Sequence, residues 1–261
     1  MKLTDEQFEQ YQAEGYVVVE DVLADETIDR VRERLREYTH GDREPETFGK
    51  QLEPAVERGE VDVDEPGDAV RKMEGLGMVE EDEVFEEVAR DETIVSINEH
   101  LLGEHLKLLR SAAMLKPPHV GSEKSFHQDA AYYPIRPMDH VTVWIAVDEA
   151  TLENGCMSVV PGEHTEGIIT HETDEYETDI VIGGEEYDDE DLVKLPMEPG
   201  DALFQHCLLP HYTEPNTTDS PRRALIMSYM DARSRFTQND EERPDWVDSV
   251  HIQGEEFPGC V

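Results

Sequence analysis

Apolar residues in the first hundred positions recur mostly at three- and four-residue spacing, which is typical of amphipathic helices. Thr4 stands where a helix N-cap is expected, and two acidic residues follow it in the first turn. The pattern predicts a short helix that begins after Thr4 and ends at Gly15, followed by a β-branched strand at 16–19. It also predicts a second helix at 25–38 and two short helices within 84–102.

The pattern of polar and apolar positions changes in two places. Residues 41–69 are acidic and aperiodic, which predicts an extended loop. After residue 104, short apolar runs are separated by Gly, Pro and Asn, at 106–115, 140–147, 157–160, 202–205 and 224–229. Many short strands with turn signals between them predict a β-sandwich or barrel.

We therefore expect one domain over 1–261 that is mainly β with flanking helices. A helical part at 1–104 would pack on a β core at 105–235, and 236–261 would form an acidic tail. A second acidic stretch at 171–193 interrupts the β core and contains one short apolar run. A solvated loop is favoured there over a lid above a binding site.

The chain is strongly acidic. Asp and Glu number 63 against 22 Lys and Arg, so the formal net charge is −41. Such a surface repels itself at ordinary ionic strength, but molar salt shortens the Debye length to about 3 Å and screens the repulsion. We therefore expect adaptation to a salt-rich cytoplasm rather than an acidic interaction surface. Nucleic acids and anionic membranes require basic patches, so the composition argues against both as partners.

The cysteines and the N-terminus indicate the compartment. Cys156, Cys207 and Cys260 form no CxxC pair and are odd in number, which favours reduced thiols over a disulfide framework. Cys156 and Cys207 stand in strand-rich segments and are expected to be buried. No apolar run of 18 residues and no signal-peptide pattern occur, so we expect a cytoplasmic protein without a membrane span.

A histidine and an aspartate one residue apart, His127 and Asp129, lie in the stretch FHQDAAYYPIRP. They stand where a strand is expected to end, and residues i and i+2 of a strand face one side, so both can reach one metal ion. Two imidazoles and one carboxylate bind Fe(II) on one face and leave positions open for a co-substrate and oxygen. Similar pairs that begin at His40 and His164 are expected by chance in so acidic a chain, and their turn or loop contexts would not hold a ring in place.

The second histidine ligand must come from another strand, and His206 and His211 are both candidates. The stretch HYTEPNTTDSPRRAL predicts a tight reversal from His211 into a strand that begins at Arg222. In such a hairpin the two residues would lie side by side, and the arginine could bind the far carboxylate of 2-oxoglutarate. Arg223 is better interpreted as a surface charge. These residues together predict an Fe(II)- and 2-oxoglutarate-dependent dioxygenase.

Three segments, FHQDAAYYPIRPMD, NGCMSVVPGEH at 154–164 and HYTEPNTTDSPRRAL, resemble the phytanoyl-CoA dioxygenase family. The N-terminal LTDEQFEQYQAEGYVVVEDVL resembles the usual opening of that family. The similarity extends along the chain apart from 41–69, 171–193 and the C-terminal tail. It implies a double-stranded β-helix, a jelly roll of two facing sheets, with the N-terminal helices packed outside.

The resemblance also implies the site and the reaction. His127, Asp129 and His211 would be the iron ligands, and Arg222 would bind the 5-carboxylate of 2-oxoglutarate. With Fe(II) and O2, such an enzyme converts 2-oxoglutarate to succinate and CO2 and hydroxylates an unactivated C–H bond. Halogenating relatives lack the carboxylate ligand, so Asp129 favours hydroxylation.

Further residues are implied around the co-substrate. Thr213 takes the place of a hydroxyl residue, often serine in the family, two positions after the second histidine. Trp144 matches a tryptophan that lines the co-substrate pocket, although its spacing from His127 is one residue shorter than in some members. Tyr132 and Tyr133 would offer an aromatic wall for a substrate, or else serve as ordinary core residues.

The substrate is expected to be a small molecule. Lys116, Lys124 and Arg136 cluster along the sequence near the metal ligands, and they could meet an anionic substrate such as a carboxylate or an acyl-CoA phosphate, or be surface charges. Two other functions stay open: a cupin-type metal oxygenase that needs no co-substrate, and a non-catalytic jelly-roll binding protein. The arginine argues against the first and the intact ligand set against the second. The sequence predicts no oligomeric state.

Overall fold

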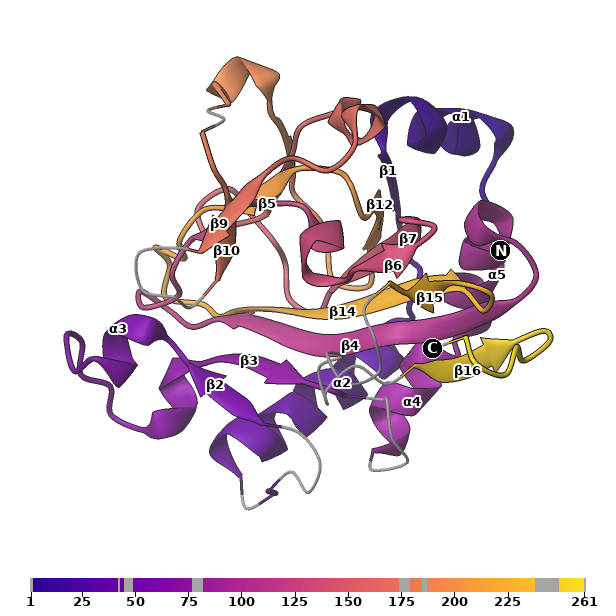
Figure 1. The fold of residues 1–261 in the computed structure, drawn as a ribbon. Helices are drawn as coiled ribbons and strands as arrows, with labels where there is room; N and C mark the ends of the chain where they lie inside the picture. The colour runs from indigo at the N-terminus through magenta and orange to yellow at the C-terminus, as the bar shows by residue number, and fades with distance from the viewer. Residues whose placement is uncertain are drawn as a thin grey trace.

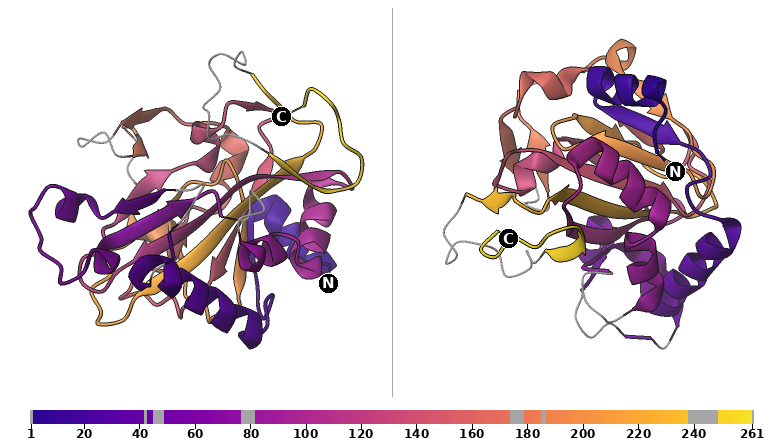
Figure 2. Two further views of the ribbon diagram at one scale, coloured as in Figure 1. Left: turned by 90° about the horizontal axis from the view of Figure 1, so that it is seen from below. Right: turned by 90° about the vertical axis from the view of Figure 1, so that its right-hand side faces the viewer.

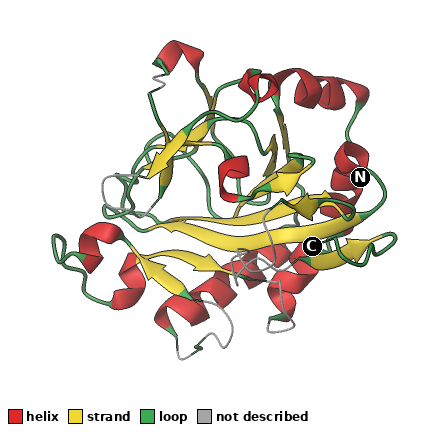
Figure 3. Ribbon diagram, in the orientation of Figure 1, coloured by secondary structure: helices red, strands yellow, loops and turns green. Residues whose placement is uncertain are grey.

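Two antiparallel β-sheets face one another, and N-terminal helices cover the outer side of the larger sheet (Figure 1, Figure 3). The computed structural model describes residues 2–41, 43–44, 49–76, 82–173, 179–184, 187–237 and 249–260. The predicted fold, a mainly β jelly roll with flanking helices, is confirmed.

The larger sheet has the order β1-β12-β7-β14-β4-β3-β2, and β16 pairs with the same edge of β4 as β3 does. Its strands are β1 Tyr16–Val19, β2 Lys50–Leu52, β3 Val70–Glu74, β4 Leu106–Lys116, β7 His140–Ala146, β12 Ala202–His206, β14 Arg222–Asp231 and β16 Val250–Gln253. The smaller sheet has the order β11-β8-β13-β5. Its strands are β5 Lys124–His127, β8 Met157–Val159, β11 Val193–Leu195 and β13 His211–Thr213. Two further pairs are β9 His171–Thr173 with β10 Ile180–Ile182, and β6 Ile135–Arg136 with β15 Arg235–Phe236.

The helices predicted from the periodicity of the sequence are confirmed. The described part of the chain contains α1 Asp5–Glu14, α2 Asp25–His40, α3 Pro54–Glu57, α4 Glu83–Ala89 and α5 Glu92–Leu102, with 3-10 turns η1 Pro66–Ala69, η2 Asp129–Tyr132, η3 Glu163–Glu166 and η4 Asp189–Asp191. Helix α1 begins with a capping box: the Gln7 backbone N–H donates to the Thr4 hydroxyl at 3.2 Å, and the Thr4 N–H donates to the Gln7 side chain at 3.0 Å. It ends at Gly15, whose φ of 83° lies in the left-handed region that glycine adopts without strain.

Strand β7 shows how the larger sheet divides the core into two layers. Every residue of β7 is buried because both of its faces are covered. Val143 and Ile145 pack in the cluster that contains α2, α4 and α5 residues, whereas Trp144 and Ala146 pack toward the smaller sheet. Burial of each large apolar side chain contributes about 1.5–3 kcal/mol. The helices therefore hold the outer face, seen from two further sides in Figure 2, and leave the inner face to form the site.

Residues 41–69 are not one extended loop, as the sequence predicted. The described part contains β2, α3 and η1. Strand β2 is short and only half-buried, and it is held by pairing with β3 at the edge of the larger sheet. Tertiary pairing stabilises it where the local pattern carries no signal. Strand β16 likewise brings part of the acidic tail onto the sheet.

The predicted hairpin between His211 and Arg222 is wrong. Strand β13 belongs to the smaller sheet and β14 to the larger one, so the intervening segment crosses between them. Its turn residues stabilise that crossing: the Asn216 side chain donates to the backbone oxygens of Lys116 at 2.9 Å and Ser220 at 2.8 Å. The two residues consequently lie on different sheets, and both line the same cavity.

None of the helices in the described part of the chain combines the length and apolarity that a bilayer crossing needs. Cys156 and Cys207 are buried free thiols, as expected, and Cys260 is half-buried.

Candidate active site

The smaller sheet brings three ligand groups together. Strand β5 ends at His127, and its direct partner in register is His211, the first residue of β13. Asp129 follows as the first residue of η2 and reaches the same point from a 3-10 turn. The sequence interpretation had instead placed His127 and Asp129 on one strand. Potential ligand atoms of the three side chains all lie within 4.8 Å of one another, and the three residues are only 5–6% exposed.

Backbone carbonyls orient both imidazoles. Nδ1 of His127 lies 2.9 Å from the Ser125 oxygen, and Nδ1 of His211 lies 2.9 Å from the Leu209 oxygen. Because a carbonyl oxygen only accepts, each Nδ1 carries the proton and each Nε2 keeps a lone pair. The two Nε2 atoms lie 3.9 and 3.8 Å from Oδ1 of Asp129. Two nitrogens and one carboxylate oxygen thus converge, and this donor set fits Fe(II) with open positions.

Electrostatics keep His127 and Asp129 in the forms that a metal ion requires. Burial lowers the pKa of His127 well below its ordinary value, so its ring is neutral. Burial alone would raise the pKa of Asp129, but His211, His127 and Arg110 outweigh it and lower that pKa, so the carboxylate is ionised. The Gln205 side-chain amide donates to Oδ2 of Asp129 at 3.3 Å and positions the carboxylate. Sequence reasoning missed Gln205, which has no local signal beyond its place on a buried strand.

His206, the other candidate ligand, lies outside this group. Its ring is 5.3 Å from that of His164 between centroids, and its Nε2 lies 3.6 Å from a carboxylate oxygen of Asp139. It ends β12 in the larger sheet and does not join the three converging ligands.

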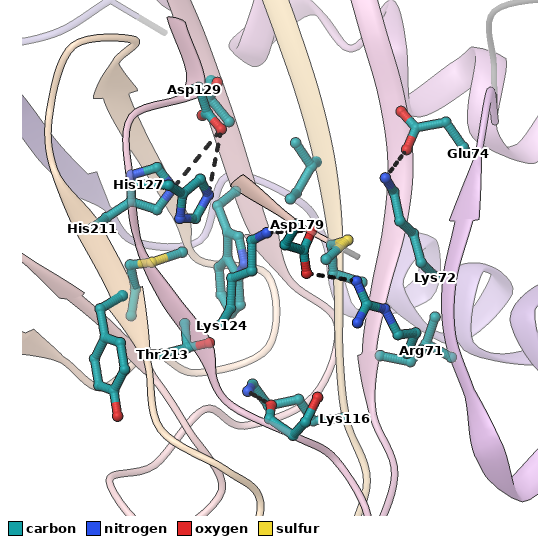
Figure 4. A pocket seen from close by; sticks show the side chains of 18 of the residues that line it. Arg71, Lys72, Glu74, Lys116, Lys124, His127, Asp129, Asp179, His211 and Thr213 are labelled. Carbon is teal, nitrogen blue, oxygen red and sulfur yellow. Dashed lines mark hydrogen bonds and ion pairs between the residues drawn. The ribbon is translucent and has the colours of Figure 1, made fainter. Parts of the chain in front are cut away.

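A cavity of about 440 Å³ extends from the three ligands between the two sheets (Figure 4). Most residues that the sequence singled out line it, namely Lys116, Lys124, Tyr132, Tyr133, Trp144, Thr213 and Arg222. Arg136 does not: it is exposed on β6, and its guanidinium donates to the Ile135 backbone oxygen at 2.9 Å. The expected cluster of Arg136 with the two lysines is therefore wrong, because the chain turns Arg136 away from the cavity.

Arg222 lines the cavity and has no ion pair among the described residues. It is buried, its guanidinium carbon lies 5.4 Å from the centre of the Trp144 ring, and its Nε has no hydrogen-bond partner. Burial lowers its pKa to about 10, so it still carries its charge at neutral pH. A buried, unpaired guanidinium is costly unless an anion binds to it. Its neighbour Arg223 instead forms two bonds to Asp148, at 2.7 and 2.9 Å, and is half-buried rather than a free surface charge.

Lys116 accompanies Arg222. The two residues are direct partners on β4 and β14, and the Lys116 ammonium donates to the Ser122 backbone oxygen. Burial, reinforced by repulsion from Arg222, lowers the pKa of Lys116 to about 6. Lys116 has no carboxylate partner among the described residues, so both basic groups can accept an anion in this part of the cavity.

A second group of charges lies on the wall formed by β3 and β4, and sequence reasoning missed it. Glu74 pairs with Arg110 at 2.6 Å and with Lys72 at 2.6 Å. Burial opposes the ionisation of Glu74, but Arg110 and Lys72 outweigh it and lower its pKa to about 2. Asp179 pairs with Arg71 at 2.9 Å. The adjacent bases Arg71 and Lys72 in a base-poor chain were the signal that could have found this wall.

The two tyrosines have different environments. Tyr132 accepts a hydrogen bond from the Lys124 ammonium at 3.0 Å, and its ring centre lies 6.1 Å from that of His127. Tyr133 lines the cavity and also packs in a small apolar cluster with Ile135 and Met230. Tyr132 therefore faces the reaction space, whereas Tyr133 shares its surface with the core.

Known proteins resemble the chain along nearly all of its length. A homologue of phytanoyl-CoA dioxygenase domain-containing protein 1 from Caenorhabditis elegans is 27% identical over 260 residues, which cover 87% of this chain and 90% of the relative. The solved apo structure of the non-heme monooxygenase ThoJ superposes with a TM-score of 0.73 at 18% identity and covers 97% of this chain and 85% of its own. The epimerase SnoN, solved with Fe3+, α-ketoglutarate and nogalamycin RO, gives a TM-score of 0.69 at 21% identity over 98% and 95% of the two chains. At these identities the two structures show a shared fold.

A match to a whole family agrees with these single relatives. Residues 11–224 match the phytanoyl-CoA dioxygenase (PhyH) family, and this range contains His127, Asp129, His211 and Arg222 and ends at the start of β14. The resemblance read from the three sequence motifs is confirmed. This chain belongs to the phytanoyl-CoA dioxygenase family.

Proposed function

We propose that the protein is an Fe(II)- and 2-oxoglutarate-dependent dioxygenase that hydroxylates an unactivated C–H bond of a small molecule. One observation carries this proposal: a buried His127–Asp129–His211 set lies in one cavity with a buried Arg222 that forms no ion pair with any described residue. The first can bind a metal ion and the second the far carboxylate of a dicarboxylic co-substrate. A metal oxygenase without a co-substrate has no use for the second feature, and a binding protein has no use for the open metal positions.

Each of the residues in the cavity would have a distinct role in this reaction. Bound Fe(II) would supply the oxygen chemistry, with 2-oxoglutarate and O2 consumed and succinate and CO2 released. Arg222 and Lys116 would bind the 5-carboxylate of 2-oxoglutarate, and the Thr213 hydroxyl would donate to it. Trp144 would pack against the co-substrate and keep water from it. Asp129, as a carboxylate ligand, favours hydroxylation as the outcome.

The size of the cavity supports a small substrate. About 440 Å³ falls in the lower part of the roughly 300–1,000 Å³ range of small-molecule sites. It has to accommodate 2-oxoglutarate as well, so an acyl-CoA could place only its acyl end inside. We propose a cytoplasmic setting of high salt, in keeping with the net charge of −41.

The test is an anaerobic titration of metal-free protein in molar KCl, first with Fe(II) and then with 2-oxoglutarate. We expect the weak visible charge-transfer band of the iron chelate in wild type. The band should be lost or much weakened in Arg222→Met and retained in the matched variant Arg223→Met, whose charge lies outside the cavity. Folded protein that binds iron but shows no band would overturn the 2-oxoglutarate assignment.

A further inference from the structure

Asp179 lies between two cations of the cavity wall (Figure 4). Its carboxylate is 2.5 Å from the Lys124 ammonium and 2.9 Å from the Arg71 guanidinium. The three residues come from separate places: Arg71 from β3, Lys124 from β5, and Asp179 from the residue before β10 in the acidic insertion. The insertion thus supplies a carboxylate, that of Asp179, which joins the two sheets across the cavity.

The cavity gathers positive charge in a chain that has little of it. Six of the 22 lysines and arginines line it, namely Arg71, Lys72, Arg110, Lys116, Lys124 and Arg222. Among the residues that the structure describes, five acidic ones do so, namely Glu53, Glu74, Glu123, Asp129 and Asp179, although the chain has 63. Bases thus slightly outnumber acids around the cavity, whereas acids outnumber bases 63 to 22 in the whole chain. This balance favours an anionic ligand.

The pairing on the β3 side leaves positive charge in excess. Arg71 and Lys124 share one carboxylate, that of Asp179, just as Lys72 and Arg110 share that of Glu74. Burial lowers the pKa of Lys124 to about 8 even with Asp179 beside it, so its charge is incompletely compensated. A second oxyanion at this place would gain charge-assisted hydrogen bonds from both cations.

We propose that Arg71 and Lys124 form the binding site for an oxyanion of the substrate, a carboxylate or a phosphate, and that Asp179 holds this site until the substrate displaces it. The inference rests on the proposed function and adds the substrate class to it. The Asp179 carboxylate then competes with the substrate oxyanion for the two cations. It keeps both cations ordered and excludes anions that bind too weakly to displace it.

Tyr132 relates this site to the metal ligands. Its hydroxyl accepts from Lys124 at 3.0 Å, and its ring lies edge-on to the ring of His127 with 6.1 Å between centroids. The oxyanion would therefore lie about one tyrosine ring away from the metal-binding end. The substrate is expected to carry its oxidised carbon only a few bonds from its charged group.

The experiment must separate this site from the co-substrate site, because Lys124 is the register partner of Thr213. Protein loaded with Ni(II), which does not support turnover, and saturated with 2-oxoglutarate would be titrated calorimetrically with inorganic phosphate and, separately, with acetate. All titrations use the same molar KCl. The two probes distinguish a phosphate site from a carboxylate site, and binding of either supports the proposal.

Three variants and a control define the expected result. Lys124→Met and Arg71→Met should weaken probe binding by about ten-fold or more, since each removes one charged donor. Asp179→Asn should tighten it, because the competitor loses its charge while its shape is kept. Lys194→Met removes a lysine outside the cavity and should leave probe binding unchanged. Retained Ni(II) and 2-oxoglutarate binding shows that each variant is folded.

Other results would overturn the proposal. Displacement of 2-oxoglutarate by the probe would place the anion on Arg222 instead. Equal probe affinities in wild type, Lys124→Met and Arg71→Met would rule out the oxyanion site. Probe binding that is no tighter in Asp179→Asn would rule out Asp179 as the competitor. The same titration of Arg222→Met without 2-oxoglutarate keeps the two hypotheses apart: probe binding that still depends on Lys124 supports the anion site even if the protein never binds 2-oxoglutarate.

Discussion

Arg222 and Lys116 lie directly opposite one another on strands β14 and β4, and both line the same cavity. While the cavity holds no anion, burial lowers the pKa of Lys116 and repulsion from Arg222 lowers it further, to about 6. The facing charges from other elements are Glu53, Glu123 and Arg71. An anion between the pair relieves the repulsion, which couples binding to the protonation of Lys116.

The affinity for 2-oxoglutarate should therefore depend on pH. A bound anion raises the pKa of Lys116. At any pH between about 6 and this raised pKa, Lys116 therefore takes up a proton when the anion binds. Below pH 6 Lys116 is already charged and affinity is flat; above it, affinity falls by up to about ten-fold per pH unit. Titration of the chelate band from pH 5.5 to 8.5 measures this. The slope should disappear in Lys116→Met, and a slope that persists there would assign it to another group.

Gln205 should tune the metal site without being a ligand. Gln205→Leu keeps the size of the side chain but removes the donor to Asp129, which leaves a buried carboxylate with one hydrogen bond fewer. We expect metal affinity to fall by roughly 10–100-fold. Competition with a fluorescent chelator gives the affinity, and the thermal midpoint gives the folding control. Unchanged affinity in folded protein would mean that Asp129 is positioned by other contacts.

Arg223 should matter for stability and not for the site. Its guanidinium pairs with Asp148 through two bonds and contributes nothing to the cavity. Arg223→Met should lower the free energy of unfolding by about 1.5–3 kcal/mol, the range for hydrogen bonds to charged groups. Urea unfolding at fixed KCl measures the loss. A loss of 2-oxoglutarate binding at unchanged stability would contradict this division between the two arginines.

Salt should stabilise the folded chain. With a net charge of −41, self-repulsion at low ionic strength opposes the compact state, and added salt screens it. The thermal midpoint should rise steeply between dilute buffer and molar KCl. Sucrose of equal osmotic strength serves as the control, because it acts by exclusion from the surface and not by screening. Equal effects of KCl and sucrose would show that charge repulsion is not the cause.

Local chemistry was enough to predict most elements. Thr4 and Gly15 mark the ends of α1 because capping and left-handed backbone are short-range effects. The long strands β4, β7 and β14 are mostly buried, and their apolar runs show in the sequence directly. Strands β2 and β3 were missed because an edge strand depends on its neighbour more than on its own residues.

The sequence also predicted the candidate metal-binding residues, but it did not predict their geometry. His127 and Asp129 are close in sequence, so any compact turn brings them together. The relation of His211 to Arg222 was predicted as a hairpin, although they lie on facing sheets. Turn residues indicate that a chain reverses, but which sheet receives the next strand depends on the packing of the whole core.

The sequence by itself determined the family, the type of elements, the donor set for the metal ion and the acidic character of the surface. Only the tertiary structure decided which charges meet. Arg71, Lys124 and Asp179 are about fifty residues apart from one to the next, and they come together because β3 joins the edge of β4 and the start of β10 lies beside the cavity. The energy of a charge depends on its distance to other charges and on its burial, and both are properties of the folded chain.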